Sequence, residues 1–310
     1  MRKFLDCHNR TGIVEQPQWA PHCWVNVECP DADDINLLLG DLHIPHDFIE
    51  SATDPDERPR MERHDGWVLT IIRIPAKTHP HTGNPYITVP MAIIINGDVV
   101  VTVCNHRTEL VDDFIAHSRE RLITIDTECD FILRLLYSST YWFLRYLKQI
   151  NDHVTAASRT LQQSIHNDDL LRLMDMQKAL VYFNTSVKGN EVLIDRIQRV
   201  YNPNQYDADL LDNIEVEIKQ ASNTVDVYST ILAGMMDSYA SIISNNVNDI
   251  MKKMTGVSIV LMLPTLIASF YGMNVAIGYG GAAWAFPVIV IGSFALAIVL
   301  YFILRKINWL

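Results

Sequence analysis

The chain has 310 residues with 36 acidic and 25 basic side chains, a formal net charge of −11. All 36 acids lie before Met254, together with 23 of the basic residues, so that region carries −13 and the remainder carries +2. An acidic body argues against a nucleic-acid partner, because phosphate binding requires clustered Lys and Arg. It suits a surface that meets cations, although acidity also serves simply to keep a domain soluble.

The beginning of the chain and its five cysteines indicate a compartment. Residues 1–6 contain no apolar run, so we expect no secretory signal peptide. The cysteines are scattered and never form a C-x-x-C pair, which is typical of a reducing compartment without disulfides. Zinc binding is a weaker alternative because the spacing matches no standard module. It would use His22, Cys23, Cys29, Cys104 and His106.

The first 120 residues are typical of an α/β domain. Runs rich in β-branched residues predict strands at 24–27, 67–74, 91–95 and 99–103, and Asn96-Gly97-Asp98 predicts a hairpin turn. Helical patterns cover 32–42 and 45–52. We find no phosphate-binding loop, Rossmann glycine pattern or nucleophile elbow, so the sequence does not predict an enzyme.

Long helices follow. Residues 121–206 predict a domain of two antiparallel helices, at about 124–165 and 168–201. After a turn at 202–204, no clear breaker interrupts the pattern from Asp207 to Met254. Pro264, further along, is expected to bend the helix rather than end it, so we predict one helix from Asp207 to Tyr271, roughly 95 Å long. Its first part, 207–253, reads as a stalk that needs neighbouring helices to bury its apolar face.

Residues 254–310 predict a membrane hairpin. Two charge-free stretches, 254–271 and 282–304, are roughly 27 Å and 34 Å long as helices, near the thickness of a bilayer core. An uncharged outer loop, 272–281, joins them, and a basic tail, 305–310, follows. The positive-inside rule places both termini and the acidic body in the cytoplasm. The flanking cations are Lys252, Lys253, Arg305 and Lys306.

One stripe of the first span differs from the rest. At steps of three and four it carries Asn248, Met251, Thr255, Ser258, Met262, Thr265 and Ser269, whereas the other positions are mostly Ile, Val, Leu and Phe. Two interpretations stand at this point. Several copies around an axis would direct the hydroxyl groups into a pore, or the stripe serves ordinary helix–helix packing.

The outer end of the first span reads Tyr271-Gly272-Met273-Asn274, and in this setting it resembles the CorA family of magnesium transport proteins. Further similar segments are 54–62 (D-P-D-E-R-P-R-M-E), 71–75 (I-I-R-I-P), 89–94 (V-P-M-A-I-I) and the tail 305–310 (R-K-I-N-W-L). The resemblance covers essentially the whole chain. Two departures are an outer loop without acids and Trp24-Val25-Asn26 where the family has W-x-D.

The resemblance implies a homopentamer in the cell inner membrane, with an α/β cytoplasmic domain, a helical stalk and the first spans around the pore. Gly272, Met273 and Asn274 would form the outer selectivity ring, where amide oxygens hold a hydrated Mg²⁺ without stripping its water. The implied pore-lining positions are Thr265, Met262, Ser258, Met254, Met251 and Asn248. Cytoplasmic Mg²⁺ bound between neighbouring bodies would close the pore, and candidate ligands are Asp207, Asp209, Asp212, Glu215, Glu217, Asp31, Asp33 and Asp34.

The leading hypothesis is therefore Mg²⁺ influx down its electrochemical gradient, gated by cytoplasmic Mg²⁺, with no cofactor besides the transported and regulatory ions. One alternative is transport of Zn²⁺, Co²⁺ or Ni²⁺, as in the ZntB-like branch. The Met thioethers are the only soft ligands on the stripe, which favours a hard, hydrated ion. A second alternative is a membrane-anchored structural or signalling protein, which would need neither the hydroxyl stripe nor Asn274.

Overall fold

A computed structural model describes residues 1–7, 12–78, 84–123, 125, 127–163, 167–273, 278, 284–307 and 309, without the side chains of 160–163. The chain divides into two compact units, Met1–Gly234 and Met235–Leu310. The first unit holds a sheet and most of the helices, and the second holds an apolar helical hairpin.

The first unit is built on a seven-stranded sheet in the order β2-β1-β3-β7-β6-β5-β4. Only β3 and β7 pair in parallel, and the remaining neighbours are antiparallel. The strands are β1 (Arg2–Asp6), β2 (Val14–Gln16), β3 (Cys23–Glu28), β4 (Arg60–His64), β5 (Trp67–Lys77), β6 (Tyr86–Asn96) and β7 (Val99–Cys104). The predicted turn at Asn96-Gly97-Asp98 does connect β6 and β7, with Gly97 at φ 51°.

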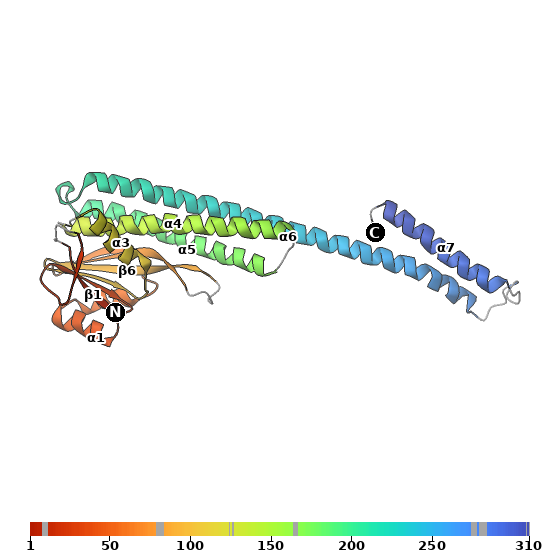
Figure 1. Ribbon diagram of the computed structural model, residues 1–310, viewed down its shortest axis with the longest axis horizontal. Helices are drawn as coiled ribbons and strands as arrows, with labels where there is room; N and C mark the ends of the chain where they lie inside the picture. Colours follow the sequence, from red (N-terminus) through yellow and green to blue (C-terminus); the bar gives the residue numbers. More distant parts are fainter. Residues whose placement is uncertain are drawn as a thin grey trace. The chain divides into compact units, whose positions relative to one another are not determined.

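Helices cover both faces of this sheet (Figure 1). One face carries three short elements, α1 (Ala32–Asn36), a π-helical turn η1 (Leu37–Asp41) and α2 (His46–Thr53). The other carries α3 (Glu109–Glu120), α4 (Glu128–Gln163) and α5 (Asn167–Val200). A short 3₁₀ turn, η2 (Pro203–Gln205), leads into α6 (Ala208–Tyr271), and α7 (Ala285–Lys306) is the last helix.

Alternation along the strands builds a separate core on each face. Val25, Leu69, Ile71 and Val101 are fully buried on the side of α1 and α2, and these long apolar strands bury well because they are covered on both sides. On the side of the long helices, Trp24 packs edge-on against Phe131, with ring centroids 5.2 Å apart. The sheet is thus the middle layer of three.

A buried amide attaches α5 to the sheet. Asn190 is fully buried; its Oδ1 accepts a hydrogen bond from the backbone N–H of Arg73 (2.9 Å), and its Nδ2 donates to the Arg73 carbonyl (2.7 Å). These bonds satisfy backbone groups on β5 that face the helices. At the preceding residue, a β-carbon on Gly189 would lie 2.8 Å from the Pro59 ring, so this close approach requires glycine.

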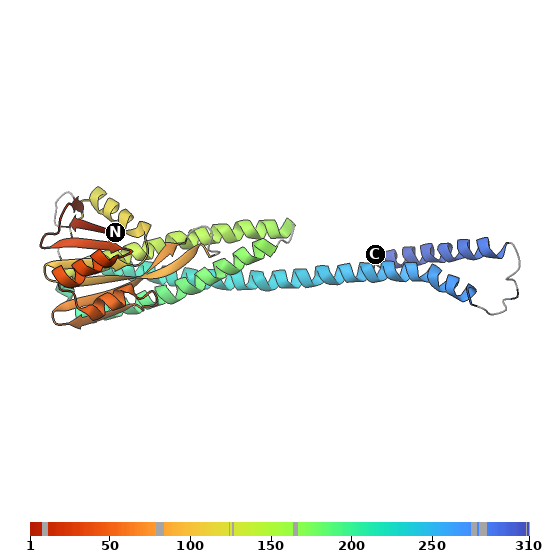
Figure 2. The ribbon, with the colours of Figure 1, turned by 90° about the horizontal axis from the view of Figure 1, so that it is seen from below.

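The part of α6 in the first unit buries one stripe of apolar residues at helical spacing, namely Leu211, Ile214, Ile218, Ala221, Val225 and Leu232. Figures 1 and 2 show this part of α6 alongside α4 and α5. Polar bonds to α5 add to the packing: Asn184 Nδ2 donates to Asp226 (2.6 Å) and Gln198 Nε2 donates to Glu215 (2.6 Å). The part of the predicted stalk that lies in the first unit is therefore a helix with neighbours that cover its apolar stripe.

Most predicted elements are present, and the misses have local causes. Strands β1, β2 and β4 and helix α3 were not predicted, and the first three are short or polar. The long helix predicted from about 124 begins at Glu128 instead, because Thr127 Oγ1 accepts a hydrogen bond from Asp130 N (3.1 Å) in the manner of an N-cap. The unbroken helix predicted over 207–271 is confirmed by α6.

Candidate cation pathway

The second unit contains the last part of α6 and all of α7. Both helices are long and apolar enough to cross a membrane, and only small fractions of their most apolar windows are buried. Figures 1 and 2 show α7 alongside the C-terminal part of α6. The hairpin therefore exposes most of its apolar surface, which suits contact with lipid or with further copies.

The contact between the two helices uses one stripe on each. On α7 the buried residues are Ser293, Ala297 and Leu304, spaced along one face. On α6 the covered positions within the span are Gly256, which is buried, and the half-buried Val260, Leu263, Pro264 and Ile267. Small residues such as Gly256, Ser293 and Ala297 let two helices approach closely within a membrane.

The hydroxyl and methionine stripe lies on a different face of α6. Met251, Met254, Ser258, Met262 and Thr265 are all exposed, Met254 by 67% of its surface. At about 100° per residue, this stripe lies roughly opposite the one that contacts α7. Asn248 is exposed and continues the stripe one turn earlier. Packing within the hairpin therefore does not account for the stripe, and its alternatives reduce to a pore or contact with another chain.

The hydroxyl groups on this stripe are oriented by the helix itself. Ser258 Oγ donates to the Met254 carbonyl (2.8 Å), and Thr265 Oγ1 donates to the Leu261 carbonyl (3.1 Å). Because each hydroxyl hydrogen is used by the backbone, the oxygen is left as an acceptor. Acceptors at this position suit the water shell of a hydrated cation.

The outer end of α6 is described only in part. The helix ends at Tyr271, and Gly272 N donates to the Ala268 carbonyl (2.9 Å). A β-carbon at Gly272 would lie 3.3 Å from that same carbonyl oxygen, so this position leaves little room for a side chain. Met273 is exposed. Asn274, the central residue of the predicted selectivity ring, lies outside the described residues.

The predicted flanking cations lie where the chain enters and leaves the hairpin, before the first apolar helix and after the second. Lys252 Nζ is 3.6 Å from Asp249 Oδ1, and Lys253 is exposed. Arg305 and Lys306 form the last turn of α7, where positive charge also complements the helix dipole. The placement suits the headgroup region at one side of a membrane.

The predicted regulatory acids in the first domain have structural partners. Asp31 caps α1, and its pKa is lowered chiefly because the Asp34 backbone N–H donates to it (2.8 Å). Asp34 is buried, and its carboxylate lies 3.1 Å from the N-terminal amine and 3.5 Å from Arg2 Nη1. Asp33 is exposed in the first turn of α1. Of these three carboxylates, only Asp33 has no hydrogen bond or ion pair of this kind among the described residues.

The predicted acids on α6 divide in the same way. Asp207 Oδ1 caps the helix by accepting from Asp209 N (3.0 Å), and Glu215 is bonded by Gln198 and Lys219. Asp209 and Asp212 are exposed, and Glu217 is half-buried. Within the described part of one chain, none of the eight predicted acids belongs to a group of three possible metal ligands.

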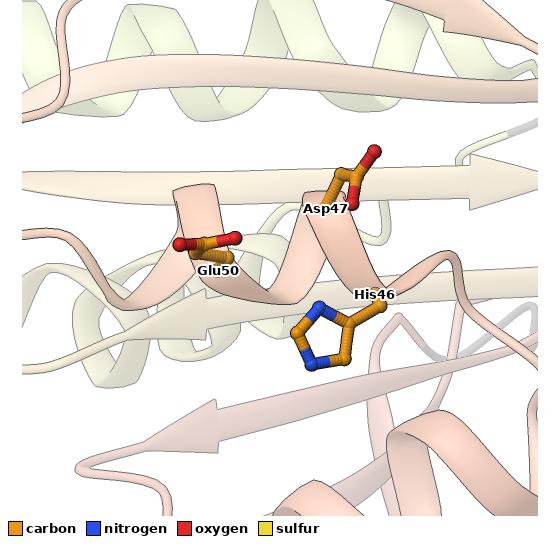
Figure 3. Close-up of side chains that lie close together, drawn as sticks. All are labelled: His46, Asp47 and Glu50. Carbon is orange, nitrogen blue, oxygen red and sulfur yellow. The ribbon is translucent and has the colours of Figure 1, made fainter.

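A different cluster does meet that geometric condition. In the described residues, the one such group is His46, Asp47 and Glu50, whose ligand atoms all lie within 4.8 Å of one another (Figure 3). All three are exposed on a single helix, α2. The spacing H-D-x-x-E was available in the sequence as a signal and was not singled out. The alternative zinc set around Cys29 and Cys104 forms no such group among the described residues.

Comparison with known proteins finds relatives that match both the body and the hairpin. The sequence model of a family described as "CorA-like Mg2+ transporter protein" matches residues 19–306. The cobalt/magnesium transport protein CorA of Methanocaldococcus jannaschii is 22% identical over 256 residues, covering 81% of this chain and 79% of that protein. The protein of the same description from Thermotoga maritima is 23% identical over 305 residues, covering 93% and 83%.

The fold is shared as well. The complete structure of the CorA magnesium transporter from Methanocaldococcus jannaschii superimposes with a TM-score of 0.80 over 100% of this chain and 99% of that chain, at 19% sequence identity. The α/β domain, the long helices and the two apolar C-terminal helices are thus elements of a known architecture.

Proposed function

Because the chain belongs to the CorA-like Mg²⁺ transporter family, we propose that it is a channel admitting divalent cations, Mg²⁺ foremost, into the cytoplasm. The observation that carries this proposal is the stripe on α6. It presents acceptor oxygens and thioethers on the face opposite the α7 contact, where another copy of α6 has access to it. A membrane anchor has no need of such a face.

The chemistry of the stripe suits a hydrated ion. Mg²⁺ gives up its water reluctantly and is usually held through several retained waters. Ser258 and Thr265 offer neutral oxygen acceptors, and no carboxylate lies on the stripe to bind the ion too tightly for release. Asn274 at the outer end would add a ring of amide oxygens. An inside-negative potential favours entry by about 4.6 kcal/mol per divalent ion per 100 mV, twice the value for a unit charge.

The proposed assembly is a homopentamer in the cell inner membrane, with both termini in the cytoplasm and the five α6 helices around the pore. Met251 and Met254 would form its narrow apolar section, which closes by excluding water. Cytoplasmic Mg²⁺ would hold that section closed. A regulatory site would then use acids from two copies. The candidates are Asp33, Asp209 and Asp212, which are exposed and have no capping or ion-pair role among the described residues.

Flux into proteoliposomes tests the proposal. A dye inside reports entry of Mg²⁺, Zn²⁺, Co²⁺ or Ni²⁺, with low or high Mg²⁺ on the cytoplasmic side. We expect Mg²⁺ influx that stops as internal Mg²⁺ rises, and its loss in Asn274→Ala with folding and assembly unchanged. Asn246→Ala, exposed on α6 away from the stripe, is the matched control and should conduct normally.

The other outcomes are equally decisive. Zn²⁺ entry with little Mg²⁺ entry would replace magnesium with zinc as the substrate. Normal Mg²⁺ flux through Asn274→Ala would remove the selectivity ring. Absence of all flux, from protein shown to be folded and oligomeric, would favour the membrane-anchor hypothesis.

A further inference from the structure

A cavity of about 520 Å³ opens between α3, α4 and the beginning of α6, entirely within the first unit. Its volume falls in the range typical of small-molecule sites, roughly 300–1,000 Å³. No residue of the proposed pore or of the proposed regulatory set lines it. The cavity therefore requires its own explanation.

The cavity is lined by more basic than acidic side chains, although the body around it is acidic. His117, Arg121 and Arg134 line it, against a single carboxylate, Asp113. That carboxylate accepts a hydrogen bond from Trp142 Nε1 (3.2 Å). Although the chain before Met254 carries −13, the acids of α6 nearest in sequence, Asp209 and Asp212, are not among the lining residues. The lining therefore has two arginines against one carboxylate, and Arg121, which has no ion pair among the described residues, is the group that would attract an anion.

The two arginines differ in their present partners. Arg134 is held in place by Asp130, which accepts from Arg134 Nε (2.7 Å). Arg121 is exposed, and among the described residues its guanidinium has no ion pair. A guanidinium fork matches the oxygens of a phosphate and forms paired, charge-assisted hydrogen bonds with it. Arg121 at the cavity wall is therefore placed to hold a phosphate group.

Two aromatic rings make the cavity more than an anion site. Tyr137 and Tyr141 lie four residues apart on α4 and so share one helix face, and both are unusually exposed, by 38% and 53%. Any of the nucleotide bases stacks readily on such rings. Ser138 and Asn213 add hydrogen-bonding groups beside them.

From this combination we infer that the cavity is a nucleotide site, with the phosphates on Arg121 and Arg134 and the base against Tyr137 and Tyr141. The ligand class is a nucleoside phosphate, because inorganic phosphate would leave the aromatic wall unused and an uncharged nucleoside would leave the arginines unused. The inference does not depend on the proposed transport function. Since Asn213 belongs to α6, a bound nucleotide would contact the same helix that carries the stripe.

Equilibrium dialysis of the full-length protein in detergent tests the inference. The probes are radiolabelled AMP, ADP and ATP at a fixed free Mg²⁺ concentration, with adenosine and inorganic phosphate as competitors. We expect at least one nucleotide to bind with Kd below about 1 mM, and Arg121→Gln to weaken it by about tenfold, the usual effect of one lost charged hydrogen bond. Tyr141→Ala should weaken it severalfold and remove the preference for nucleotide over phosphate.

Matched controls exist on α5. Arg172→Gln and Tyr182→Ala change exposed residues of the same types outside the cavity, and both should bind as the unaltered protein does. Gel filtration and thermal melting confirm that each variant is folded. The inference is overturned if no nucleotide binds below about 1 mM, if Arg121→Gln and Tyr141→Ala both bind normally, or if phosphate competes as well as the nucleotides.

Discussion

The two units of this chain differ in where they place the same apolar residue types, which are buried in the first unit and exposed in the second. In the sheet, Leu69, Ile72 and Ile93 are completely buried by the chain itself. In the hairpin, Leu261 and Ile291 expose 66% and 68% of their surface. The body is therefore stabilised by its own packing, whereas the hairpin requires lipid or further copies to cover it. Charge marks the apolar hairpin in advance, since no acid follows Met254, although the second unit itself begins earlier, at Met235.

The largest expected contrast concerns the cysteines, all of which lie in the body. Burial raises the pKa of the Cys7, Cys104 and Cys129 thiols to about 12, whereas Cys29 is exposed. At pH 8 the three buried thiols should have about a thousandth of the thiolate of an ordinary thiol with a pKa near 9. Titration with a disulfide reagent should label one cysteine per folded chain quickly and all five after denaturation.

The raised pKa values of these thiols also determine how the stability of the folded protein changes with pH. A folded-state pKa above the unfolded value means that the stabilisation is complete below about pH 9 and is lost as the pH rises towards 12. The urea midpoint should therefore fall between pH 8 and pH 10, and the fall should be smaller in Cys104→Ala. Rapid labelling of several cysteines in the folded protein would contradict the buried core.

Phe183→Ala should destabilise the body by about 3–5 kcal/mol, the usual cost of deleting a buried aromatic ring. Phe183 is fully buried and packs edge-on against Phe143, with centroids 5.1 Å apart. Phe270→Ala in the hairpin is the matched change, at 60% exposure, and should leave the urea midpoint of the body unchanged. Tryptophan fluorescence during urea unfolding measures both, and equal losses would break the distinction between the units.

Asn190→Leu should cost about 1–3 kcal/mol, because it removes both bonds to Arg73 and takes away the side-chain acceptor of the Arg73 N–H, whereas the Arg73 carbonyl keeps its bond from Ser139 Oγ. Asn184→Leu on the same helix is the control. Its Nδ2 donates to Asp226 at the exposed surface, where water replaces the lost bond. Equal urea midpoints for the two variants would show that Asn190 does not attach α5 to the sheet.

The smallest effect is expected at Gly234, inside α6. A β-carbon there meets no atom within 4 Å, so Gly234→Ala should stabilise the helix by about 0.5–1 kcal/mol through its better helix propensity. Gly256→Ala provides the contrast, because Gly256 is buried on the α7 contact stripe. Thermal melting in detergent compares the two, and destabilisation by Gly234→Ala would show that this glycine has a packing role.

The sequence predicts the parts of this fold that depend on long periodic patterns. The 64-residue helix α6 and the apolar α7 were predictable because their patterns continue over many residues, even though Pro264 lies inside α6. Strand β4 was not, because Arg60–His64 is polar and is a strand only through its pairing with β5. Helix α3 was missed although Thr108 supplies an N-cap, its Oγ1 accepting from Leu110 N (3.1 Å).

The site was predictable to a similar extent. Spacing alone identified the stripe, because its residues differ in type from their neighbours. It did not show that the stripe lies opposite the α7 contact, which depends on how the two helices pack. Nor did it show that Asp34 and Glu215 are already paired, since their partners lie far away or on another helix. The cavity joins three separate segments around His117, Tyr137 and Asn213, so no local pattern indicates it.

The most direct test of the central claim is cysteine accessibility during transport. Ser258→Cys lies on the stripe, and Val257→Cys, one residue earlier, lies off it; both are exposed within the span, and Cys29→Ser removes the exposed native thiol. Mg²⁺ flux into proteoliposomes is measured before and after a charged, membrane-impermeant thiol reagent. We predict that the reagent blocks flux through Ser258→Cys and spares Val257→Cys. Block of Val257→Cys with Ser258→Cys unaffected would contradict the claim that this stripe lines the pore.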